Sequence, residues 1–411
     1  MRFRVIGCVV VKCEIGLHVS PPIPRRPRLA PPRAQVGAAL TMAAPAPPAD
    51  VTVEEIDVRA YTVPTDFPES DGTAQWDATT IVVVHAHGGG RTGLGFTYGS
   101  PASGAVISSS LRAILIGHDA MRVSAAWELM AVACRNLGRP GVASMAIAAV
   151  DTALWDLKAR LLELPLATLL DAAHESVPVY GSGGFTSYPD TRLAEQLGGW
   201  VAQGIPRVKM KIGREPDRDL ERVRAAREAI GDDAALFVDA NGALTRAQAL
   251  WFARRYAEEF GASWFEEPVS SDDLEGLRYI RDRAPVGMDI AAGEYGYKLD
   301  YFAKMLAAGS VSCLQADVTR CEGITGFLRV AALCEARSLE LSAHCGPSIH
   351  AHPCCAVSSL RHLEYFHDHV RLERMLFDGV LEPRDGALYP DFTRPGNGLE
   401  LKCADAERFA V

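Results

Sequence analysis

Polar side chains of the types used in catalysis recur along the second half of the chain at nearly constant intervals. They are Lys209 and Lys211, followed by Asp239, Glu266, Glu294, Asp317, His344 and Glu364. From Lys211 onward, successive positions are 28, 27, 28, 23, 27 and 20 residues apart. One buried strand, one helix and two short loops need about this length, so the spacing predicts repeated βα units. If each residue closes its strand, all of them meet at one end of a parallel sheet or barrel.

Lys209 and Lys211 are two residues apart, so on a strand both ammonium groups project from the same face. Two cations this close lower each other's pKa, which helps one of them act as a neutral base near pH 7. A lone Lys-x-Lys is more often a pair of ordinary lysines on a solvated edge strand. The residues that close the following units favour the catalytic interpretation.

Three carboxylates, Asp239, Glu266 and Glu294, close three successive units. Brought together at one end of a barrel, they would repel one another unless a cation lay between them, and hard oxygen ligands suit Mg²⁺. A single carboxylate at a strand end more often caps the next helix, but three in succession are hard to explain in that way. Glu267, beside Glu266, is given only a supporting role.

Asp317 and His344 close the next two units. On adjacent strands the aspartate would fix the tautomer of the imidazole and raise its basicity, as in a general acid/base dyad. His344 is also one of several histidines in this part of the chain, and a second hypothesis is a zinc site. Its ligands would be His350, His352, Cys354 and Cys355, whose spacing fits no standard zinc motif.

Each of these polar residues follows a short apolar run that is typical of a buried strand. Between the runs, residues 217–230 show helical spacing and stop at Gly231, and Thr245 is a candidate N-cap for a helix that ends before Gly261. The predicted strands are 208–212, 235–238, 263–265, 286–292, 311–316 and 339–343.

The pattern before the barrel is different and predicts an α+β domain over residues 51–176. Its strands are expected at 53–63 and 79–85, with the glycine-rich segment 88–99 as a turn and a core-facing helix within 142–170. The barrel is expected over residues 177–385. Residues 386–411 contain no further βα unit and are expected to pack on the first domain.

The first 50 residues differ from the rest of the chain. Residues 21–49 are rich in Pro, Ala and Arg and have no usable periodicity, so residues 1–50 are interpreted as a disordered or non-native extension. Met42 is a candidate start. The apolar run 5–11 is cut short by Lys12 and Glu14, which argues against a secretory signal and leaves the cytoplasm as the expected location.

Composition excludes several classes of protein. The formal net charge of -9 and the lack of a long basic stripe argue against nucleic-acid binding. No run approaches the roughly 18 apolar residues of a membrane-spanning helix. Ten cysteines without a CxxC pair suit a reducing compartment better than a disulfide framework.

Taken in order, these motifs resemble the enolase superfamily, in its mandelate racemase subgroup, over about residues 51–405. The segments that carry the resemblance are VKMKIG, VDANG, FEEP, AAGE, QAD and SAHCGPS, together with the helix SMAIAAVDTALWDLKAR. The resemblance implies an α/β fold, a (β/α)7β TIM-like barrel with an N-terminal α+β capping domain completed by the C-terminal segment. One departure is the sequence Leu169-Leu170-Asp171-Ala172, where that family usually has Leu-Leu-Gly-Gly, so the crossing from cap to barrel is expected to differ in shape.

The resemblance also implies roles. Lys211 is similar to the family's base and Lys209 to the residue that assists it and holds the substrate carboxylate. Glu364 matches the carboxylic acid that hydrogen-bonds the same carboxylate and can donate if its pKa is raised. His344 with Asp317 matches the acid/base on the opposite face. The ligands of one Mg²⁺ per subunit would be Asp239, Glu266 and Glu294.

A site of this kind removes a proton next to a carboxylate, and members with the full set resemble acid-sugar dehydratases. We therefore expect a dehydratase of a sugar acid that acts as a homo-oligomer. A racemase, epimerase or cycloisomerase could use the same residues, and a catalytically silent binding or structural protein would keep only the fold. Residues 65–77, a polar loop of the cap, are the expected specificity element, and Tyr180 and Ser182 are weaker candidates.

Overall fold

A computed structural model describes residues 51–411. The predictions made for the first 50 residues, including the disordered extension and the start at Met42, lie outside the described residues. Within residues 51–411, no helix is both long enough and apolar enough to cross a membrane.

The cap is built on an antiparallel sheet in the order β1-β2-β3, formed by β1 Glu55–Ser70, β2 Gln75–Gly88 and β3 Arg91–Tyr98. The turn predicted over 88–99 is wrong, because most of this segment is strand β3. Its glycines serve close packing: a Cβ on Gly93 would lie 2.2 Å from the backbone oxygen of Ala153, and one on Gly95 would lie 2.2 Å from that of Ala149. Glycine here lets a helix lie directly on the sheet.

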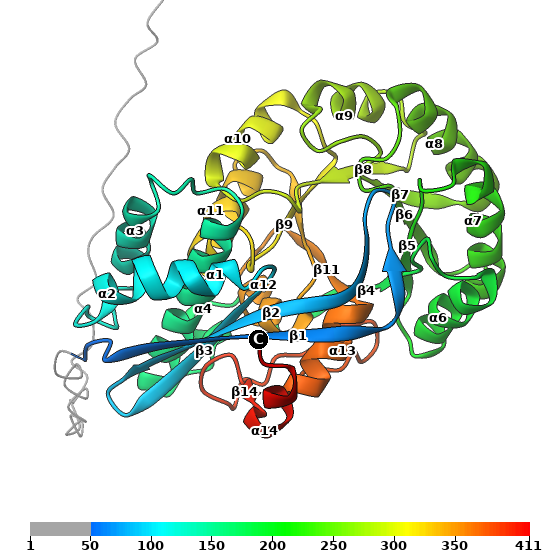
Figure 1. The fold of residues 1–411 in the computed structure, drawn as a ribbon. Helices are drawn as coiled ribbons and strands as arrows, with labels where there is room; N and C mark the ends of the chain where they lie inside the picture. The colour runs from blue at the N-terminus through cyan, green and yellow to red at the C-terminus, as the bar shows by residue number, and fades with distance from the viewer. Residues whose placement is uncertain (1–50) are drawn as a thin grey trace, which may run out of the picture. The chain divides into compact units, whose positions relative to one another are not determined.

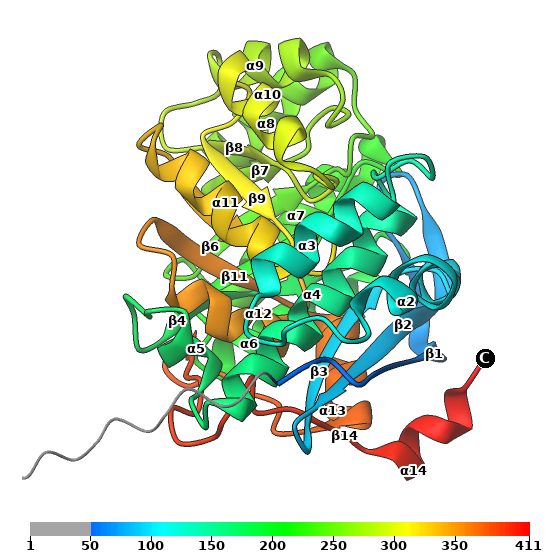
Figure 2. The ribbon, with the colours of Figure 1, turned by 90° about the vertical axis from the view of Figure 1, so that its left-hand side faces the viewer.

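That helix is α4, Val142–Leu161, which is buried on nearly every side and lies between strand β3 and barrel helix α11 (Figure 2). Its alanines permit close approach on both faces. Asp171 follows at the crossing into the barrel with φ +61°, a left-handed conformation that aspartate tolerates better than most residues. The remaining cap helices are α1 Ala102–Val106, η1 Ile107–Leu111, α2 Arg112–Leu115, α3 Val123–Ala133 and α5 Leu166–Leu169.

Eight parallel strands form a barrel that closes where the last strand pairs with the first (Figure 1). Seven helices alternate with them, which confirms the predicted α/β barrel with an antiparallel capping sheet. The strands are β4 Val177–Gly183, β5 Arg207–Lys211, β6 Ala235–Asp239, β7 Ala262–Glu266, β8 Asp289–Ala292, β9 Cys313–Ala316, β10 Glu340–Ala343 and β11 Leu360–Phe366. The helices are α6 Asp190–Ala202, α7 Pro216–Ile230, α8 Arg246–Phe260, α9 Leu274–Arg281, α10 Leu299–Ala308, α11 Gly323–Glu335 and α12 Pro347–Cys355.

Capping residues in the sequence correctly predicted both ends of helix α8. Thr245 caps α8 through a reciprocal capping box with Gln248, and Gly261 ends the helix in the left-handed conformation, as predicted. Strand β8 begins three residues later than expected, because Val286 is fully exposed and Gly287 turns the chain at φ +93°. An apolar side chain alone therefore did not mark the start of that strand.

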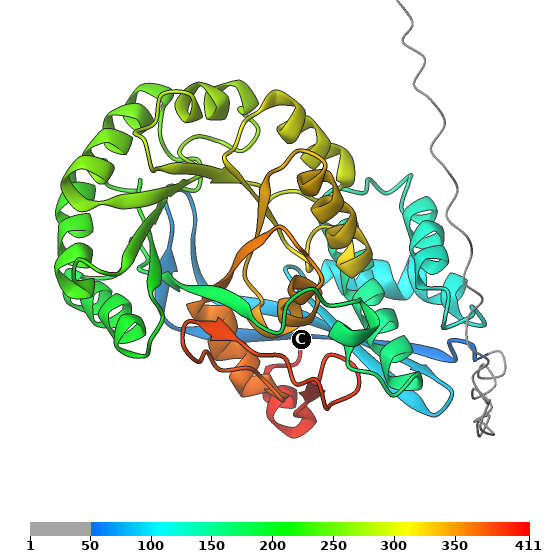
Figure 3. The ribbon, with the colours of Figure 1, turned by 180° about the vertical axis from the view of Figure 1, so that it is seen from behind.

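The C-terminal segment leaves the barrel and returns to the cap (Figure 3). Its elements are α13 His367–Leu376, β12 Phe377–Asp378, β13 Ala387–Leu388, β14 Glu400–Leu401, α14 Cys403–Ala406 and η2 Glu407–Phe409. β13 pairs with barrel strand β4. Farther on, Leu399 and Ala406 share an apolar cluster with Tyr61 and Phe96 of the capping sheet, and Ala410 forms a bridge to Tyr61.

Candidate active site

Of the eight recurring polar residues, six lie at or just after the carboxyl ends of barrel strands, and Lys209 and Glu364 lie two residues before the ends of β5 and β11. Lys211, Asp239 and Glu266 are neighbours across three strands in register. Glu294 follows β8 by two residues, Asp317 follows β9 directly, and His344 follows β10 directly. Each of these side chains is at most 5% exposed, so the barrel and the cap remove them almost completely from bulk water.

Asp239, Glu266 and Glu294 each place a carboxylate oxygen within 4.8 Å of the others. Burial, followed by the charge of Asp239, raises the pKa of Glu266 to about 8. Glu294 Oε2 accepts no hydrogen bond from any described residue. Three buried oxygen donors that repel one another, one of them unsatisfied, have the chemistry of a site for a hard divalent cation such as Mg²⁺.

Glu267 lies beside this triad but outside it. Its backbone has φ +38°, and its side chain is 1% exposed. Burial and the charge of Glu294 raise the pKa of its carboxyl well above the usual range. Since it does not share the cluster of three ligand oxygens, it remains a neighbour that adds negative charge.

The two lysines pair with the carboxylates. Lys209 contacts Glu266 and lies 3.2 Å from Asp239 Oδ2 and 2.9 Å from Glu364 Oε1, while Lys211 donates to Asp239 Oδ2 at 2.6 Å. Burial favours the neutral amine, but these carboxylates raise the pKa of both lysines above the usual value. Lys209 does lower the pKa of Lys211, as expected for two neighbouring cations, but the facing carboxylates outnumber the lysines and outweigh this effect.

Asp317 and His344 form a hydrogen-bonded pair, with Nδ1 2.8 Å from Asp317 Oδ2. The other aspartate oxygen accepts from Thr319 N and Oγ1, both at 2.7 Å, which fixes the carboxylate. Burial opposes ionisation of Asp317, but its bond to His344 lowers its pKa below the usual range. The other ring nitrogen of His344, Nε2, lies 3.3 Å from Glu294 Oε2.

Glu364 divides its two oxygens between different partners. Oε1 faces Lys209, while Oε2 accepts from the backbone N–H of Cys345 at 3.2 Å and lies 3.6 Å from His344 Nε2. Burial alone would raise the pKa of this carboxyl, but Lys209 and His344 lower it below the usual range. In this arrangement Glu364 accepts hydrogen bonds, in contrast to the donating role expected for it.

A cavity of ≈ 370 Å³ opens on Lys211, Glu294, His344 and Glu364. The other residues that line the cavity come from the cap, from loops, and from β11 and α13. They are Asp71, Trp76, Ala78, Thr79, Thr80, Tyr98, Gly99, Asn241, Tyr295, Arg320, Cys345, Phe366 and His369. Asp71 and Trp76 lie in the predicted specificity element, and sequence reasoning missed most of the others. Asn241, Tyr295, Arg320 and Cys345 lie one to three residues beyond a predicted strand-end residue, so proximity in sequence was an available signal for them.

The weaker candidates Tyr180 and Ser182 do not line this cavity. Tyr180 is buried inside the barrel against Phe237, and its ring lies 5.4 Å from Lys209 Nζ. Ser182 is fully buried. In the barrel sheet, Tyr180 is paired with Glu364 and Ser182 with Lys209.

The expected loop over residues 65–77 is instead the end of a long hairpin. Strand β1 continues to Ser70 and β2 begins at Gln75, leaving a turn of four residues in which Asp71 Oδ1 accepts from the N–H groups of Thr73 and Ala74. Asp71 and Trp76 line the cavity, so this segment does border the site as expected.

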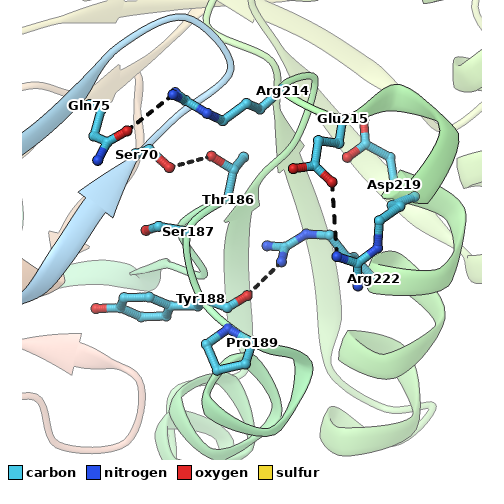
Figure 4. Close-up of a pocket in the computed structure, with 11 residues that line it drawn as sticks. Ser70, Gln75, Thr186, Ser187, Tyr188, Pro189, Arg214, Glu215, Asp219 and Arg222 are labelled. Carbon is cyan, nitrogen blue, oxygen red and sulfur yellow. Dashed lines mark hydrogen bonds and ion pairs between the residues drawn. The ribbon is translucent and has the colours of Figure 1, made fainter.

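The hairpin tip is held on the barrel by polar contacts around a second cavity of ≈ 350 Å³ (Figure 4). Ser70 Oγ bonds Thr186 Oγ1 at 2.6 Å, and Arg214 donates to the backbone oxygen of Ala74 and to Gln75 Oε1, both at 3.1 Å. Arg214 follows Lys211 by three residues. The same loop thus carries a site residue and a contact that positions the cap over the site.

The alternative zinc site is not assembled. His350 Nε2 accepts from the N–H of Val318 at 2.7 Å, and His352 Nδ1 accepts from the N–H of Ala167 at 3.1 Å. Neither histidine nor Cys354 or Cys355 belongs to any group of potential metal ligands within residues 51–411. These residues of α12 are buried packing and hydrogen-bonding groups.

An α+β cap over a parallel barrel with an acidic triad, two lysines and a His–Asp pair defines an enzyme that acts on a carboxylate. Residues 55–171 match the model of the mandelate racemase / muconate lactonizing enzyme N-terminal domain, and residues 192–406 match the enolase C-terminal domain-like model. The chain belongs to the mandelate racemase / muconate lactonizing enzyme family of the enolase superfamily.

Relatives within this family have several activities. A 3,6-anhydro-alpha-L-galactonate cycloisomerase of Streptomyces coelicolor is 36% identical over 86% of this chain and 98% of its own length. An L-talarate/galactarate dehydratase of Salmonella typhimurium is 33% identical over 76% of this chain and 78% of its own.

Solved structures agree with the fold. A mandelate racemase/muconate lactonizing enzyme-like protein from Rubrobacter xylanophilus has 61% sequence identity and a TM-score of 0.86, covering 88% of this chain and all of that one. A racemase from Streptomyces coelicolor with bound magnesium has 33% identity and a TM-score of 0.82, covering 87% of this chain and all of that one.

Proposed function

We propose that the protein is a Mg²⁺-dependent dehydratase of a sugar acid, an aldonate or aldarate, and forms a 2-keto-3-deoxy acid. The observation that carries this proposal is the position of two proton-transfer groups, Lys211 Nζ and His344 Nε2, on different strands around one acidic triad and one cavity. A single base would suffice for proton removal alone. Loss of a hydroxide also needs an acid.

The difficult step is removal of the proton next to the substrate carboxylate, because the product is a dianionic enediolate. Lys211 takes this proton. Lys209, which is fully buried, donates to the carboxylate oxygens as their charge increases. Mg²⁺ held by Asp239, Glu266 and Glu294 would supply electrostatic stabilisation of the same oxygens. With Asp239 neutralised by a bound cation, the ammonium group of Lys211 would no longer be needed as its partner, and Lys211 could act as the base.

His344 then protonates the departing hydroxyl group through Nε2, while Asp317 holds Nδ1–H and keeps the ring in place. Glu364 lies beside both Lys209 and His344. A substrate carboxylate bound near it would raise its pKa by like-charge repulsion and favour the protonated form, which can donate a hydrogen bond to that carboxylate.

The cavity supports a hydroxylated substrate. Its lining combines the ionic groups of the barrel with Asp71, Thr79, Thr80 and Asn241. A chain of hydroxyl groups needs several donors and acceptors, because each buried hydroxyl without a partner costs about 1–3 kcal/mol. Relatives named as dehydratases of talarate/galactarate and arabinonate are 33% and 30% identical to this chain.

A cycloisomerase is the second candidate. The observation that favours it is the 36% identity with the anhydrogalactonate cycloisomerase over 98% of that protein's length. The same two groups could transfer protons on opposite sides of a substrate without releasing water, so the residues of the triad and the dyad fit both reactions.

The experiment is a screen of the purified protein with Mg²⁺ against aldonic acids, aldaric acids, their lactones and anhydro derivatives. Each reaction in deuterium oxide is read for 2-keto acid and for deuterium at the carbon next to the carboxylate. Keto acid identifies a dehydratase. An isomerised product with deuterium but without keto acid would replace the proposal by the cycloisomerase or a racemase, and the Lys211→Ala variant is the control for contaminating activity.

A further inference from the structure

Cys345 brings a sulfur atom into the candidate active site, where the proposed mechanism has no use for it. Its Sγ lies 3.2 Å from His344 Nε2 and 3.4 Å from Glu364 Oε2. The remaining distance of the triangle, from His344 Nε2 to Glu364 Oε2, is 3.6 Å. One nitrogen, one sulfur and one oxygen thus face a common point.

The size of this triangle can be compared with a coordination shell. In a tetrahedral zinc site the metal lies about 2.0–2.1 Å from nitrogen, about 2.3 Å from sulfur and about 2.0–2.2 Å from oxygen. These lengths place neighbouring ligand atoms roughly 3.3–3.6 Å apart. The three measured distances are within a few tenths of an ångström of those values, so little movement is needed to bind an ion.

Hydrogen bonds can hold these three groups together while no ion is bound. The thiol can donate to Glu364 Oε2, and its sulfur can accept from the Nε2–H of His344. Glu364 directs its other oxygen, Oε1, to Lys209 and so keeps Oε2 on the side of the sulfur. A cation between the three atoms would satisfy all of them at once.

The donor set differs from that of the acidic triad. Asp239, Glu266 and Glu294 offer only oxygen, which suits Mg²⁺, whereas imidazole and thiolate favour Zn²⁺ and related ions. His344, Cys345 and Glu364 are at most 5% exposed, yet all three line the cavity of ≈ 370 Å³. An ion can therefore enter from the cavity, and its fourth position would be open to water or a substrate oxygen.

We propose that His344, Cys345 and Glu364 form a second cation site, selective for thiophilic divalent ions such as Zn²⁺ and separate from the acidic triad. When the ion binds, the Cys345 thiol and the Nε2–H of His344 each lose a proton to solvent. Occupancy leaves His344 Nε2 without a proton to donate and removes one oxygen of Glu364 from substrate chemistry. The protein is thus inhibited reversibly by Zn²⁺ while its Mg²⁺ site stays filled.

Cobalt provides a test that does not depend on turnover. The full-length protein, saturated with Mg²⁺, is titrated with Co²⁺, and the absorption is followed in the ultraviolet and visible regions. We expect thiolate-to-cobalt charge-transfer absorption and tetrahedral d–d bands that saturate at one Co²⁺ per chain and disappear on addition of Zn²⁺.

Variants assign the bands. Cys345→Ser should abolish the charge-transfer band, and His344→Asn should weaken Co²⁺ binding by about 100-fold or more, since even changes beyond the direct ligands cost about 10–100-fold. The matched control is Cys403→Ser, which removes the exposed cysteine of the described residues and should leave the spectrum unchanged. Circular dichroism establishes that each variant is folded.

Absence of the charge-transfer band from the wild-type protein would overturn the proposal, and so would an unchanged band in folded Cys345→Ser. Displacement of Co²⁺ by excess Mg²⁺ would show that the two sites are one. Because these readouts need no substrate, they stand even if the dehydratase proposal fails. Once a substrate is known, Zn²⁺ should inhibit the wild type at concentrations at least 10-fold lower than those that inhibit Cys345→Ser.

Discussion

At the scale of single residues, the site depends on how opposite charges share a buried space. Lys209 and Lys211 face Asp239, Glu266 and Glu364 in a region that excludes water, so removing any one charge changes the electrostatic balance of all the others. The role of each side chain is therefore best identified from which reaction its variant loses, and not only from how much activity is lost.

Replacing the two proton-transfer groups should produce different defects. Lys211→Ala is expected to abolish both dehydration and exchange of the proton next to the carboxylate, with a fall in kcat of about 10²–10⁴-fold or more. His344→Asn should lose dehydration to a similar extent but keep the exchange, because Lys211 still takes the proton. Keto acid formation and deuterium incorporation are measured on the same samples; retention of dehydration by both variants would contradict the two-group mechanism.

Replacing one carboxylate of the triad should remove the divalent cation. Glu294→Gln keeps the shape of the side chain but removes a charge that the other two ligands cannot replace. We expect loss of Mg²⁺ binding in calorimetry, together with loss of the rise in Tm that Mg²⁺ gives the wild type. Glu275→Gln, on the surface helix α9, is the matched control and should bind Mg²⁺ normally; equal Mg²⁺ affinity in Glu294→Gln would exclude this residue as a ligand.

At the scale of elements, the alternation of strand and helix was readable because every unit repeats the same pattern of an apolar run, a polar residue and a helix. From that repetition the barrel fold and the residues at the ends of its strands could be predicted. The repetition gave no information on β3, whose glycines suggested a turn. In the structure these glycines make room for the backbone of α4, which packs directly on the strand. Nor did the repetition reveal Tyr98 or Phe366, the last residues of β3 and β11, as lining residues of the cavity.

The β1–β2 hairpin depends on Arg214 for part of its position. Arg214→Ala removes two hydrogen bonds to the tip, at the Ala74 oxygen and Gln75 Oε1, and should let the tip open more often. We expect faster hydrogen exchange in residues 68–76 and a KM that rises by about 3–10-fold, with Tm nearly unchanged because the exposed bonds contribute little. Arg218→Ala changes an arginine in the same cavity without a bond to the hairpin; equal effects in both variants would contradict the positioning role.

Helix α4 is joined to α11 by a buried carboxyl group whose titration should appear in stability. Asp151 accepts from Thr325 N at 2.9 Å and from Thr325 Oγ1 at 2.7 Å, and burial, partly offset by these bonds, raises its pKa to about 7. The folded state therefore holds the proton more tightly than the unfolded state, in which the pKa has its ordinary value of 3.8. The resulting stability is complete below that value and is lost as the pH rises through about 7.

Asp151→Asn cannot titrate and should flatten this dependence. Between pH 5 and pH 8 the wild type is expected to lose more stability than the variant, measured by Tm or by denaturant midpoint at several pH values. Glu373, whose buried carboxyl also has a pKa of about 7, titrates in both proteins and cancels in the difference. Parallel curves for the two proteins would contradict the assignment.

At the scale of the whole molecule, the cap and barrel act together because the site is assembled from both. The sequence predicted part of this, because Asp71 and Trp76 of the expected specificity element line the same cavity as Lys211, more than 130 residues farther along the chain. It did not predict that Thr79, Thr80 and Tyr98 of the cap also line it. The net electrostatic balance was also beyond reach. The lowering of the Lys211 pKa by Lys209 was predicted, but the number of facing carboxylates that outweigh it follows only from the closed barrel.

The outer surface of the cap leads to the last prediction, that the protein assembles as a homo-oligomer. Leu129, Val132 and Leu137, on and after α3, are 44%, 67% and 57% exposed, and Ile114 and Ile116 lie exposed near α2 in the same part of the chain. Exposed apolar side chains that gather on one part of a surface are typical of contacts between subunits. Light scattering should give a mass that is a multiple of 44.3 kDa.

Val132→Asp tests where that contact lies, because a charge buried between subunits without a partner is strongly unfavourable. The variant should have a smaller mass or dissociate at a protein concentration at least about 10-fold higher than the wild type. Trp251→Asp, which changes another exposed apolar residue on barrel helix α8, is the control and should keep the wild-type mass. A monomeric wild type would refute the oligomer, whereas a normal mass for Val132→Asp and a reduced mass for Trp251→Asp would move the contact from the cap to the barrel.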